Sequence, residues 1–299
     1  MAELRRLRYF LAVAEERNFT RAAARLLIAQ PALSRQIREL EKEMGVRLLD
    51  RTTQYVEPTE AGRLLMERGQ ALVREADRLW REVRGFATGA KGSLSFGYSA
   101  STGYETAPAL LERLAETNPG ITVDAKLLST AELLAAVADG TLDAGLLRCP
   151  PPTPQLVRTL VRLEPQGVLM HQGHPLAAQS ELPAIALAEE TILLHPREAN
   201  PGHYDAITAI FQRAGITPEF RPRRLFDTAH TPVAQGKAVA VVGASTLPGL
   251  PADLVWRPLA PAEAIEIHLL TRGNPSRPAL AHLLRATAAV AREHGWLRV

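Results

Sequence analysis

The chain has 299 residues, of which 46% are hydrophobic and 22% charged, a balance typical of a globular protein long enough for two or three domains. Its single cysteine, Cys149, excludes an internal disulfide and a zinc site built on several thiolates. Residues 1–58 hold eleven Lys and Arg against eight Asp and Glu, whereas the rest holds 24 of each. The excess positive charge is therefore confined to the first segment, as expected if that segment alone meets a polyanion.

No apolar run approaches the roughly 18 to 20 residues that span a bilayer. The first ten residues enter an amphipathic pattern directly, without an apolar leader or a small-residue cleavage site. We therefore expect a cytoplasmic protein that has no membrane partner.

Three helices are predicted in the N-terminal segment. The first, 4–16, has apolar residues at spacings of three and four. Thr20 is predicted to cap a second helix, 21–27, and Pro31 begins a third, where its fixed φ and missing N–H suit the first helical position. The third helix ends at Gly45. Its predicted buried stripe is Leu33, Ile37, Leu40 and Met44.

Residues 46–58 alternate apolar and polar side chains around a Thr-Thr-Gln turn, which predicts a small hairpin or wing. Thr59 is then predicted to cap a long helix that lasts to about Ala87. Steps of four and three between apolar positions indicate the seam of a two-helix coiled coil, with packing on the helix's own domain as the alternative. The seam positions are Leu65, Gly69, Leu72, Ala76, Leu79, Val83 and Phe86. Glycines near the end of this helix and just after it predict a hinge at 89–93.

Beyond the hinge, strands alternate with helices, which predicts an α/β domain with a largely parallel sheet. The predicted strands are 94–100, 121–128, 142–148, 167–171, 191–195, 238–242 and 265–271. The predicted helices are 106–116, 131–139, 204–214 and a final one from Arg277.

The third helix exposes a polar face that suits a helix-turn-helix. Ser34, Arg35 and Arg38 share this face, and Gln30 lies at the start of the helix. In the major groove, Arg can donate two hydrogen bonds to guanine and Gln can pair with adenine. A solvated polar face on a small helical domain would give the same pattern, so the residues alone leave both readings open.

The segment LRYFLAVAEERNFTRAAARLLIAQPALSRQIRELEKEMGVRLLDRTTQYVEPTEAG closely resembles the N-terminal signature of LysR-type transcriptional regulators. The resemblance covers nearly all of residues 4–62 and is carried by AQPALSRQI followed by LE, G and LL-R with T-AG. It implies a winged helix-turn-helix that binds promoter DNA, a linker helix that forms a homodimer, and a homotetramer. The implied DNA-binding residues are Thr20, Gln30, Pro31, Ser34, Arg35, Arg38, Arg51 and Thr52. For Arg51, a structural ion pair is the alternative to a phosphate contact.

Polar residues follow three of the predicted strands. Ser101 and Thr102 follow the first strand, Thr130 follows the second directly after Ser129, and Arg148 closes the third. Ligands of α/β domains gather at such strand ends, and hydroxyls with free N–H groups near a helix start favour a carboxylate. Local helix capping by Ser129 or Thr130 explains part of the pattern equally well.

Residues 92–299 resemble the two-lobed effector domain of the same family, which is similar to periplasmic solute-binding proteins. LDAGLLR, HPL, TILLHP and VGAS resemble the subgroup that responds to benzoate, muconate and chlorinated relatives. Effector contacts of that subgroup fall on Ser101, Thr130, Arg148, Pro201 and His203. Two positions depart from it: His203 replaces an aromatic or apolar residue, and Gly243 replaces a proline. Both departures leave the ligand open.

The expected organisation is a DNA-binding domain at 1–58, a linker helix at 59–88, a hinge at 89–93 and an effector domain at 94–299. Its first lobe comprises 94–163 and 268–299, and its second comprises 164–267. The ligand is expected to be a small acid, an aromatic acid or a muconate-type compound.

Three other functions are alternatives to this one. The sequence has no G-x-S-x-G elbow, H-E-x-x-H motif or phosphate-binding glycine loop, so we expect neither an enzyme nor a cofactor or metal site. A different effector class stays open, including oxidant sensing through Cys149, although a disulfide switch within one chain needs two thiols. Residues 1–88 argue against a solute-binding protein unrelated to transcription.

Overall fold

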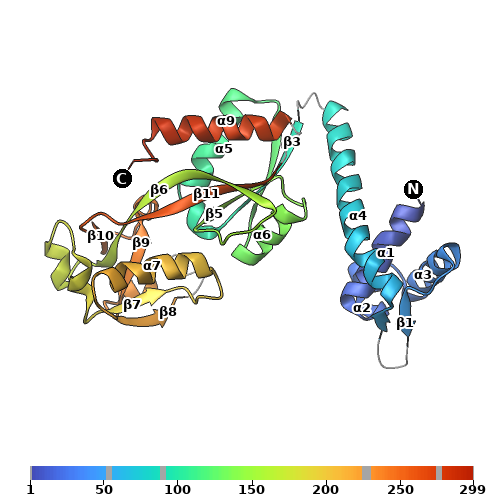
Figure 1. The fold of residues 1–299 in the computed structure, drawn as a ribbon, viewed down its shortest axis with the longest axis horizontal. Coiled ribbons are helices and arrows are strands. Elements are labelled where there is room, and N and C mark those ends of the chain that lie inside the picture. Colours follow the sequence, from blue (N-terminus) through green and yellow to red (C-terminus); the bar gives the residue numbers. More distant parts are fainter. Residues whose placement is uncertain (1, 52–55, 88–91, 224–229, 274–277, 299) are drawn as a thin grey trace. The chain divides into compact units, whose positions relative to one another are not determined.

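The computed structural model describes residues 2–51, 56–87, 92–223, 230–273 and 278–298 (Figure 1). Contacts divide the chain into two compact units, Met1–Arg84 and Gly85–Val299. We call them the head and the effector unit. Among the residues that the structure describes, no helix combines the length and apolar character needed to cross a membrane.

The head is built from three short helices, a hairpin and a long helix. The helices are α1 (Ala2–Glu16), α2 (Phe19–Arg25), α3 (Gln30–Met44) and α4 (Glu60–Ala87). Strands β1 (Leu49–Arg51) and β2 (Val56–Pro58) pair antiparallel, as predicted for the wing. The head's core includes the fully buried side chains of Phe10, Leu33, Ile37 and Leu48.

Two details of the head differ from the prediction. Asn18 caps α2 in place of Thr20, because its side-chain oxygen accepts the N–H groups of Thr20 at 2.9 Å and Arg21 at 3.0 Å. Asn is as good an N-cap as Thr, so the helix begins two residues earlier than expected. Met44 is 48% exposed, because α3 ends there and the chain turns away at Gly45 with φ of 68°.

The predicted seam of α4 divides into two halves. Thr59 caps the helix as predicted, since its Oγ1 accepts the N–H of Gly62 at 3.0 Å. In the first half, Gly69 is buried against Leu7 and Leu65 packs on the head's core. Ordinary packing within the head, the alternative to a coiled coil, therefore accounts for these positions.

The second half of α4 presents an exposed apolar surface. Leu72, Leu79 and Val83 are 59%, 54% and 50% exposed, and Trp80 is 44% exposed. Large apolar side chains gathered on one exposed helix are typical of a protein–protein contact. We call these four residues the α4 apolar surface.

Nine strands of the described residues form one sheet in the effector unit, in the order β4-β3-β5-β11-β6-β9-β7-β8, with β10 paired to β6. The strands are β3 (Gly92–Tyr98), β4 (Ile121–Leu127), β5 (Ala144–Arg148), β6 (Leu156–His171), β7 (Thr191–Leu194), β8 (Glu219–Pro222), β9 (Val239–Gly243), β10 (Leu254–Pro258) and β11 (Ala264–Arg272). The helices are α5 (Thr106–Thr117), α6 (Thr130–Ala138), α7 (Pro201–Arg213), α8 (Thr231–Ala234) and α9 (Pro278–Glu293).

The sheet is mixed rather than largely parallel. β3 pairs in parallel with β4 and β5, and β7 with β8 and β9, but β6 and β11 run antiparallel between these groups. β6 is 16 residues long, whereas only 167–171 were predicted. The sequence pattern did not predict the rest of β6 because charged residues, Arg162 and Glu164 among them, interrupt the apolar pattern there. These residues are buried in ion pairs. Pro165 also argued against a strand.

Strands β6 and β11 cross between two separate cores (Figure 1). Val161 of β6 and Ile267 of β11 pack with α5 and α9 in one core. Val168 of β6 and Ile265 of β11 pack with α7 in the other. Two extended strands are thus shared by both parts of the sheet.

Candidate functional site

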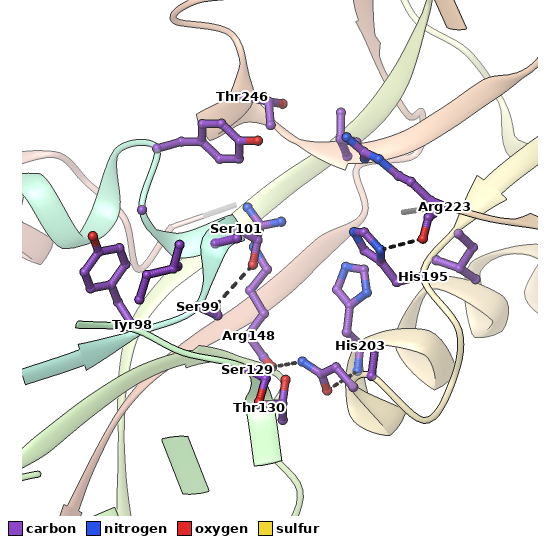
Figure 2. A pocket seen from close by; sticks show the side chains of 18 of the residues that line it. Tyr98, Ser99, Ser101, Ser129, Thr130, Arg148, His195, His203, Arg223 and Thr246 are labelled. Atoms are coloured by element: carbon purple, nitrogen blue, oxygen red, sulfur yellow. Dashed lines mark hydrogen bonds between the residues drawn. The ribbon is translucent and has the colours of Figure 1, made fainter. Parts of the chain in front are cut away.

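A cavity of about 400 Å³ lies among the strand ends of the effector unit (Figure 2). One wall comes from the ends of β3, β4 and β5, and the other from the ends of β7 and β9 and the first turn of α7. This volume lies within the range of roughly 300–1,000 Å³ found for small-molecule sites. The position at the carboxyl ends of parallel strands is the one that the strand-end rule predicts.

We call the first wall the hydroxyl wall. It contains Ser99, Ser101, Ser129 and Thr130. The hydroxyls of Ser99 and Ser101 lie 3.3 Å apart, and Ser129 is the N-cap of α6, bound to Glu132 through both its side chain and its backbone N–H. Local capping is therefore what Ser129 does. Thr130 stands at the first position of α6, where backbone N–H groups have no partner within the helix.

Two predicted effector contacts do not line the cavity. The hydroxyl of Thr102 turns inward and donates to the carbonyls of Ser99 at 2.9 Å and Leu146 at 3.3 Å, because a short 3₁₀ turn follows β3. Pro201 begins α7 but is absent from the cavity lining. Ser101, Thr130, Arg148 and His203 do line it.

Arg148 reaches the cavity with its charge already paired. Its Nη2 forms an ion pair with the Glu164 carboxylate and donates to the Ser245 hydroxyl at 3.1 Å. The side chains of Arg148 and Glu164 are 5% and 0% exposed, so each depends on the other to offset its lost hydration. Arg148, predicted as an effector contact, thus lines the cavity with the Glu164 carboxylate already bound to it.

Gly243 makes room for this buried pair. A Cβ at Gly243 would lie 2.3 Å from the carboxyl carbon of Glu164, closer than side chains tolerate. The backbone φ of −73° is ordinary, so the requirement is one of space alone. The buried Glu164 side chain therefore requires a glycine at position 243, where the subgroup usually has a proline.

We call the second wall the histidine wall. It contains His195, directly after β7, His203 in the first turn of α7, and Arg223, directly after β8. Burial and the charge of Arg223 lower the pKa of His195. Burial, followed by the charges of Arg148, His195 and Arg223, lowers the pKa of His203 to about 3. Both imidazoles are thus neutral near pH 7.

Asn200 fixes the position of His203. As the N-cap of α7, its side-chain oxygen accepts the N–H of His203 at 3.1 Å, and its Nδ2 donates to the Arg148 carbonyl at 3.0 Å. Gly202 permits this close approach, because a Cβ there would lie 2.1 Å from the carbonyl oxygen of Cys149. The start of α7 is therefore anchored to the end of β5, with the His203 ring at the cavity.

Sequence reasoning found His203 but missed other members of this wall. His195 ends the predicted strand TILLH, so the strand-end rule could have identified it. Arg223 could not be found in that way, because β8 itself was not predicted.

Cys149 directly follows β5 and is half-buried. Burial raises the pKa of its thiol to about 11. The thiolate is the nucleophilic form, so a thiol held neutral in this way is a poor oxidant sensor. Among the described residues, no group of three or more His, Cys, Asp and Glu could hold a metal ion.

The candidate DNA contacts of the head lie on α2, α3 and the wing. Thr20, Gln30, Pro31, Arg35 and Arg38 are exposed, and Ser34 is half-buried. Arg35 donates to Glu39 at 3.1 Å, and the Arg38 Nε donates to the Ser34 carbonyl at 3.3 Å. Both are surface contacts that a phosphate or a base can replace at little cost. Arg51 ends β1, whereas Thr52 lies outside the described residues.

Comparison with known protein families matches both parts of the chain. Residues 4–63 match the family described as "Bacterial regulatory helix-turn-helix protein, lysR family". Residues 87–292 match "LysR substrate binding domain".

Individual proteins that resemble this chain include a transcriptional regulator and a protein bound to its target DNA. The transcriptional regulator BenM of Acinetobacter baylyi is 32% identical over 266 residues, which cover 88% of this chain and 87% of BenM. The crystal structure of full-length CbnR with its target DNA covers 96% of this chain and 99% of CbnR, with TM-score 0.76 and 27% identity. The BenM effector-binding domain with its effector benzoate covers 69% of this chain and 95% of that domain, with TM-score 0.64 and 24% identity.

Proposed function

The chain belongs to the LysR family of bacterial transcriptional regulators, and from this premise we propose that a small aromatic acid in the cavity of the effector unit controls its action at a promoter. Members of the family and the relatives named above are DNA-binding regulators with an effector-binding domain, not enzymes. The observation that carries the proposal is the cavity at the strand ends, with hydroxyls on one wall.

The effector carboxylate is proposed to bind at the hydroxyl wall. Ser101 and Thr130 offer hydroxyls there, and the first turn of α6 offers the backbone N–H groups that its capping box, Ser129 with Glu132, does not use. Benzoate, the effector of BenM, supports an aromatic acid for this relative of BenM. Arg148 adds little net charge because Glu164 is bound to it.

At the promoter, α3 is proposed to enter the major groove. Arg35 and Arg38 would read bases or hold phosphates, with Gln30, Pro31 and Ser34 on the same helix and Thr20 on α2 against the backbone. Arg51 and Thr52 are proposed to contact DNA from the wing. Such a regulator meets its promoter in the cytoplasm, which is the compartment we propose.

A homodimer through the α4 apolar surface completes the proposal, with a homotetramer as its higher assembly. Leu72, Leu79, Trp80 and Val83 would be covered by a partner helix. In this scheme 1–58 bind DNA, 59–88 form the linker helix, 89–93 the hinge and 94–299 the effector domain. The lobes of that domain are 94–163 with 268–299, and 164–267.

An effector can act only if it binds one lobe arrangement more tightly than another. The cavity receives residues from both cores of the effector unit, so closure on a ligand would bend the crossing strands β6 and β11. The linker helices would then carry this change to the DNA-binding segments.

Calorimetric titration of the full chain with benzoate tests the proposal. We expect saturable one-site binding that Ser101→Ala or Thr130→Ala weakens about tenfold, the effect of losing a hydrogen bond to a charged group. Ser180→Ala is the matched control, because Ser180 is exposed and does not line the cavity. Equal weakening by the control, or no effect of either cavity variant, would remove the hydroxyl wall from the site.

A further inference from the structure

We propose that the natural effector is a hydroxylated aromatic acid, whose carboxylate binds at the hydroxyl wall and whose ring hydroxyl is recognised by His195 and His203. This inference rests on the proposed function and specifies the chemical class of its ligand. It concerns the histidine wall, where this chain has His203 in place of an aromatic or apolar side chain.

The hydrogen bond of His195 fixes which of its nitrogens carries the proton. Nδ1 lies 3.3 Å from the backbone carbonyl oxygen of Arg223. A carbonyl oxygen can only accept, so Nδ1 must be the donor. In the neutral ring, Nε2 then carries a lone pair and no hydrogen. His195 therefore offers the cavity an acceptor, which pairs with a ligand O–H and repels a carboxylate oxygen.

The ring of His203 has no hydrogen bond to any other described residue, although its backbone N–H is held by Asn200. The ring lines the cavity close to His195, whose charge would disfavour its protonation (Figure 2). As a neutral imidazole it has one donor and one acceptor. A hydroxyl oxygen, which both donates and accepts, can bond to both rings at once.

A second carboxylate fits this wall less well. A carboxylate can only accept hydrogen bonds, so it could bind the N–H of the neutral His203 ring but would face the lone pair at His195 Nε2. Burial and neighbouring arginines oppose the protonation that would remove this lone pair. Of those arginines, Arg148 is bound to Glu164, and the Arg223 guanidinium lies 2.7 Å from His230 Nδ1. The surroundings thus keep the two imidazoles neutral and hydrogen-bonding.

Apolar side chains from the same strand ends also line the cavity. They are Leu127, Leu128, Leu193, Leu194, Val241 and Val242. A planar ring can pack on these apolar side chains while polar groups at its two ends bind the hydroxyl wall and the histidine wall. Burying a ligand hydroxyl against an apolar surface without a partner would instead cost affinity, so the two imidazoles select for the hydroxyl.

The test compares ligands within each variant of the full chain. Calorimetric titrations use benzoate, 3-hydroxybenzoate, 4-hydroxybenzoate and terephthalate, a dicarboxylate of similar length. In the natural protein we expect one of the two hydroxybenzoates to bind about tenfold more tightly than benzoate, as one well-formed hydrogen bond to a buried group allows.

Three variants assign this preference to the histidines. His195→Phe and His203→Phe should each bring the ratio of hydroxybenzoate to benzoate affinity close to one, whereas His195→Gln, which keeps an acceptor, should retain part of it. His282→Phe is the control, because His282 lies on α9 outside the cavity lining. Since the readout is a ratio within one variant, a general loss of stability does not imitate the expected result.

The outcomes that would contradict this inference differ from those that would contradict the proposed function. A preference that survives in both Phe variants, terephthalate binding more tightly than either hydroxybenzoate, or benzoate binding as tightly as both, overturns this inference and leaves the proposed function intact. Failure of all four acids to bind a natural protein that still binds its promoter overturns the proposed function itself.

Discussion

The two units of the chain treat charge in opposite ways. The head keeps its candidate contact arginines at the surface, where Arg35 has a side chain that is 76% exposed and only a surface partner. The effector unit buries Arg148 with Glu164, and Arg162 with Glu105 at 2.7 Å beneath the ring of Trp296. A surface that binds a polyanion needs charges that can be released to it, whereas a cavity selective for one ligand needs polar groups held in place.

The largest loss of stability should come from breaking the buried ion pair of Arg148 and Glu164 in the effector unit. Glu164→Gln leaves the Arg148 charge buried without a carboxylate, and removing one partner of such a pair costs about 3–5 kcal/mol. Urea unfolding of the full chain, followed by the fluorescence of Trp256 and Trp296 in the effector unit, measures the loss.

The matched control is Asp205→Asn, which breaks the exposed ion pair with Arg197. We expect no shift of the unfolding midpoint, because both side chains are more than half exposed. Equal effects of the two substitutions would show that burial does not distinguish these pairs.

The neutral state of His203 should appear as a pH dependence of stability. Its pKa is about 3 in the folded chain, below the ordinary value of about 6.5, so the unfolded chain binds a proton more readily. Above about pH 6.5, His203 is neutral in both the folded and the unfolded chain and does not change the free energy of unfolding. As the pH falls from there toward 3, the free energy of unfolding decreases by up to about 1.4 kcal/mol per pH unit. His203→Phe should remove one proton from the slope of unfolding free energy against pH. An unchanged slope would contradict the neutral imidazole.

The α4 apolar surface gives the head a different kind of exposed group. Leu72→Asp places a charge among Leu79, Trp80 and Val83 and should weaken a dimer by about 100-fold, the loss expected for one buried Leu and one desolvated charge. Sedimentation equilibrium measures the dissociation constant. Ala71→Asp adds the same charge at an exposed position outside the seam, and it should leave the assembly intact.

A smaller effect is expected for each arginine of α3. Arg35→Ala and Arg38→Ala should each weaken promoter binding by about 1–3 kcal/mol if they contact bases, and should reduce the salt slope by about one if they contact phosphates. Fluorescence anisotropy at two or more salt concentrations distinguishes these cases. Arg197→Ala in the effector unit is the control, and affinities unchanged in both head variants would exclude α3 from the interface.

The contrast between the units also explains what the sequence could predict. Helices α3 and α4 follow long apolar periods, and their limits were found within one or two residues because caps such as Thr59 and Gly45 act locally. The first half of β6 was missed because Arg162 and Glu164 pair with residues distant in the sequence. Local patterns cannot reveal such partners.

The same limit applies to the cavity. Strand ends led to Ser101, Thr130 and Arg148, since the topology of parallel strands fixes where those residues gather. The spacing of Arg148 and Glu164 gave no sign that they pair, and the inward turn of Thr102 depends on a 3₁₀ turn without a sequence marker. The sequence thus predicted where these residues lie but not which residues they bind.

The smallest predicted effect is a gain of stability at the start of α3. Ala29 is its N-cap and has no side-chain acceptor, although its extended backbone (φ −72°, ψ 134°) is the one that a capping Ser adopts. In Ala29→Ser the hydroxyl can accept the N–H of Ala32. Because Pro31 has no N–H to cap, we expect the lower part of the usual range, about 0.5–1 kcal/mol. Thermal unfolding of the head transition measures this gain, and Ala32→Ser, which puts the same residue inside the helix, should instead lose about 0.5 kcal/mol. If both substitutions shift the transition in the same direction, the gain does not come from capping.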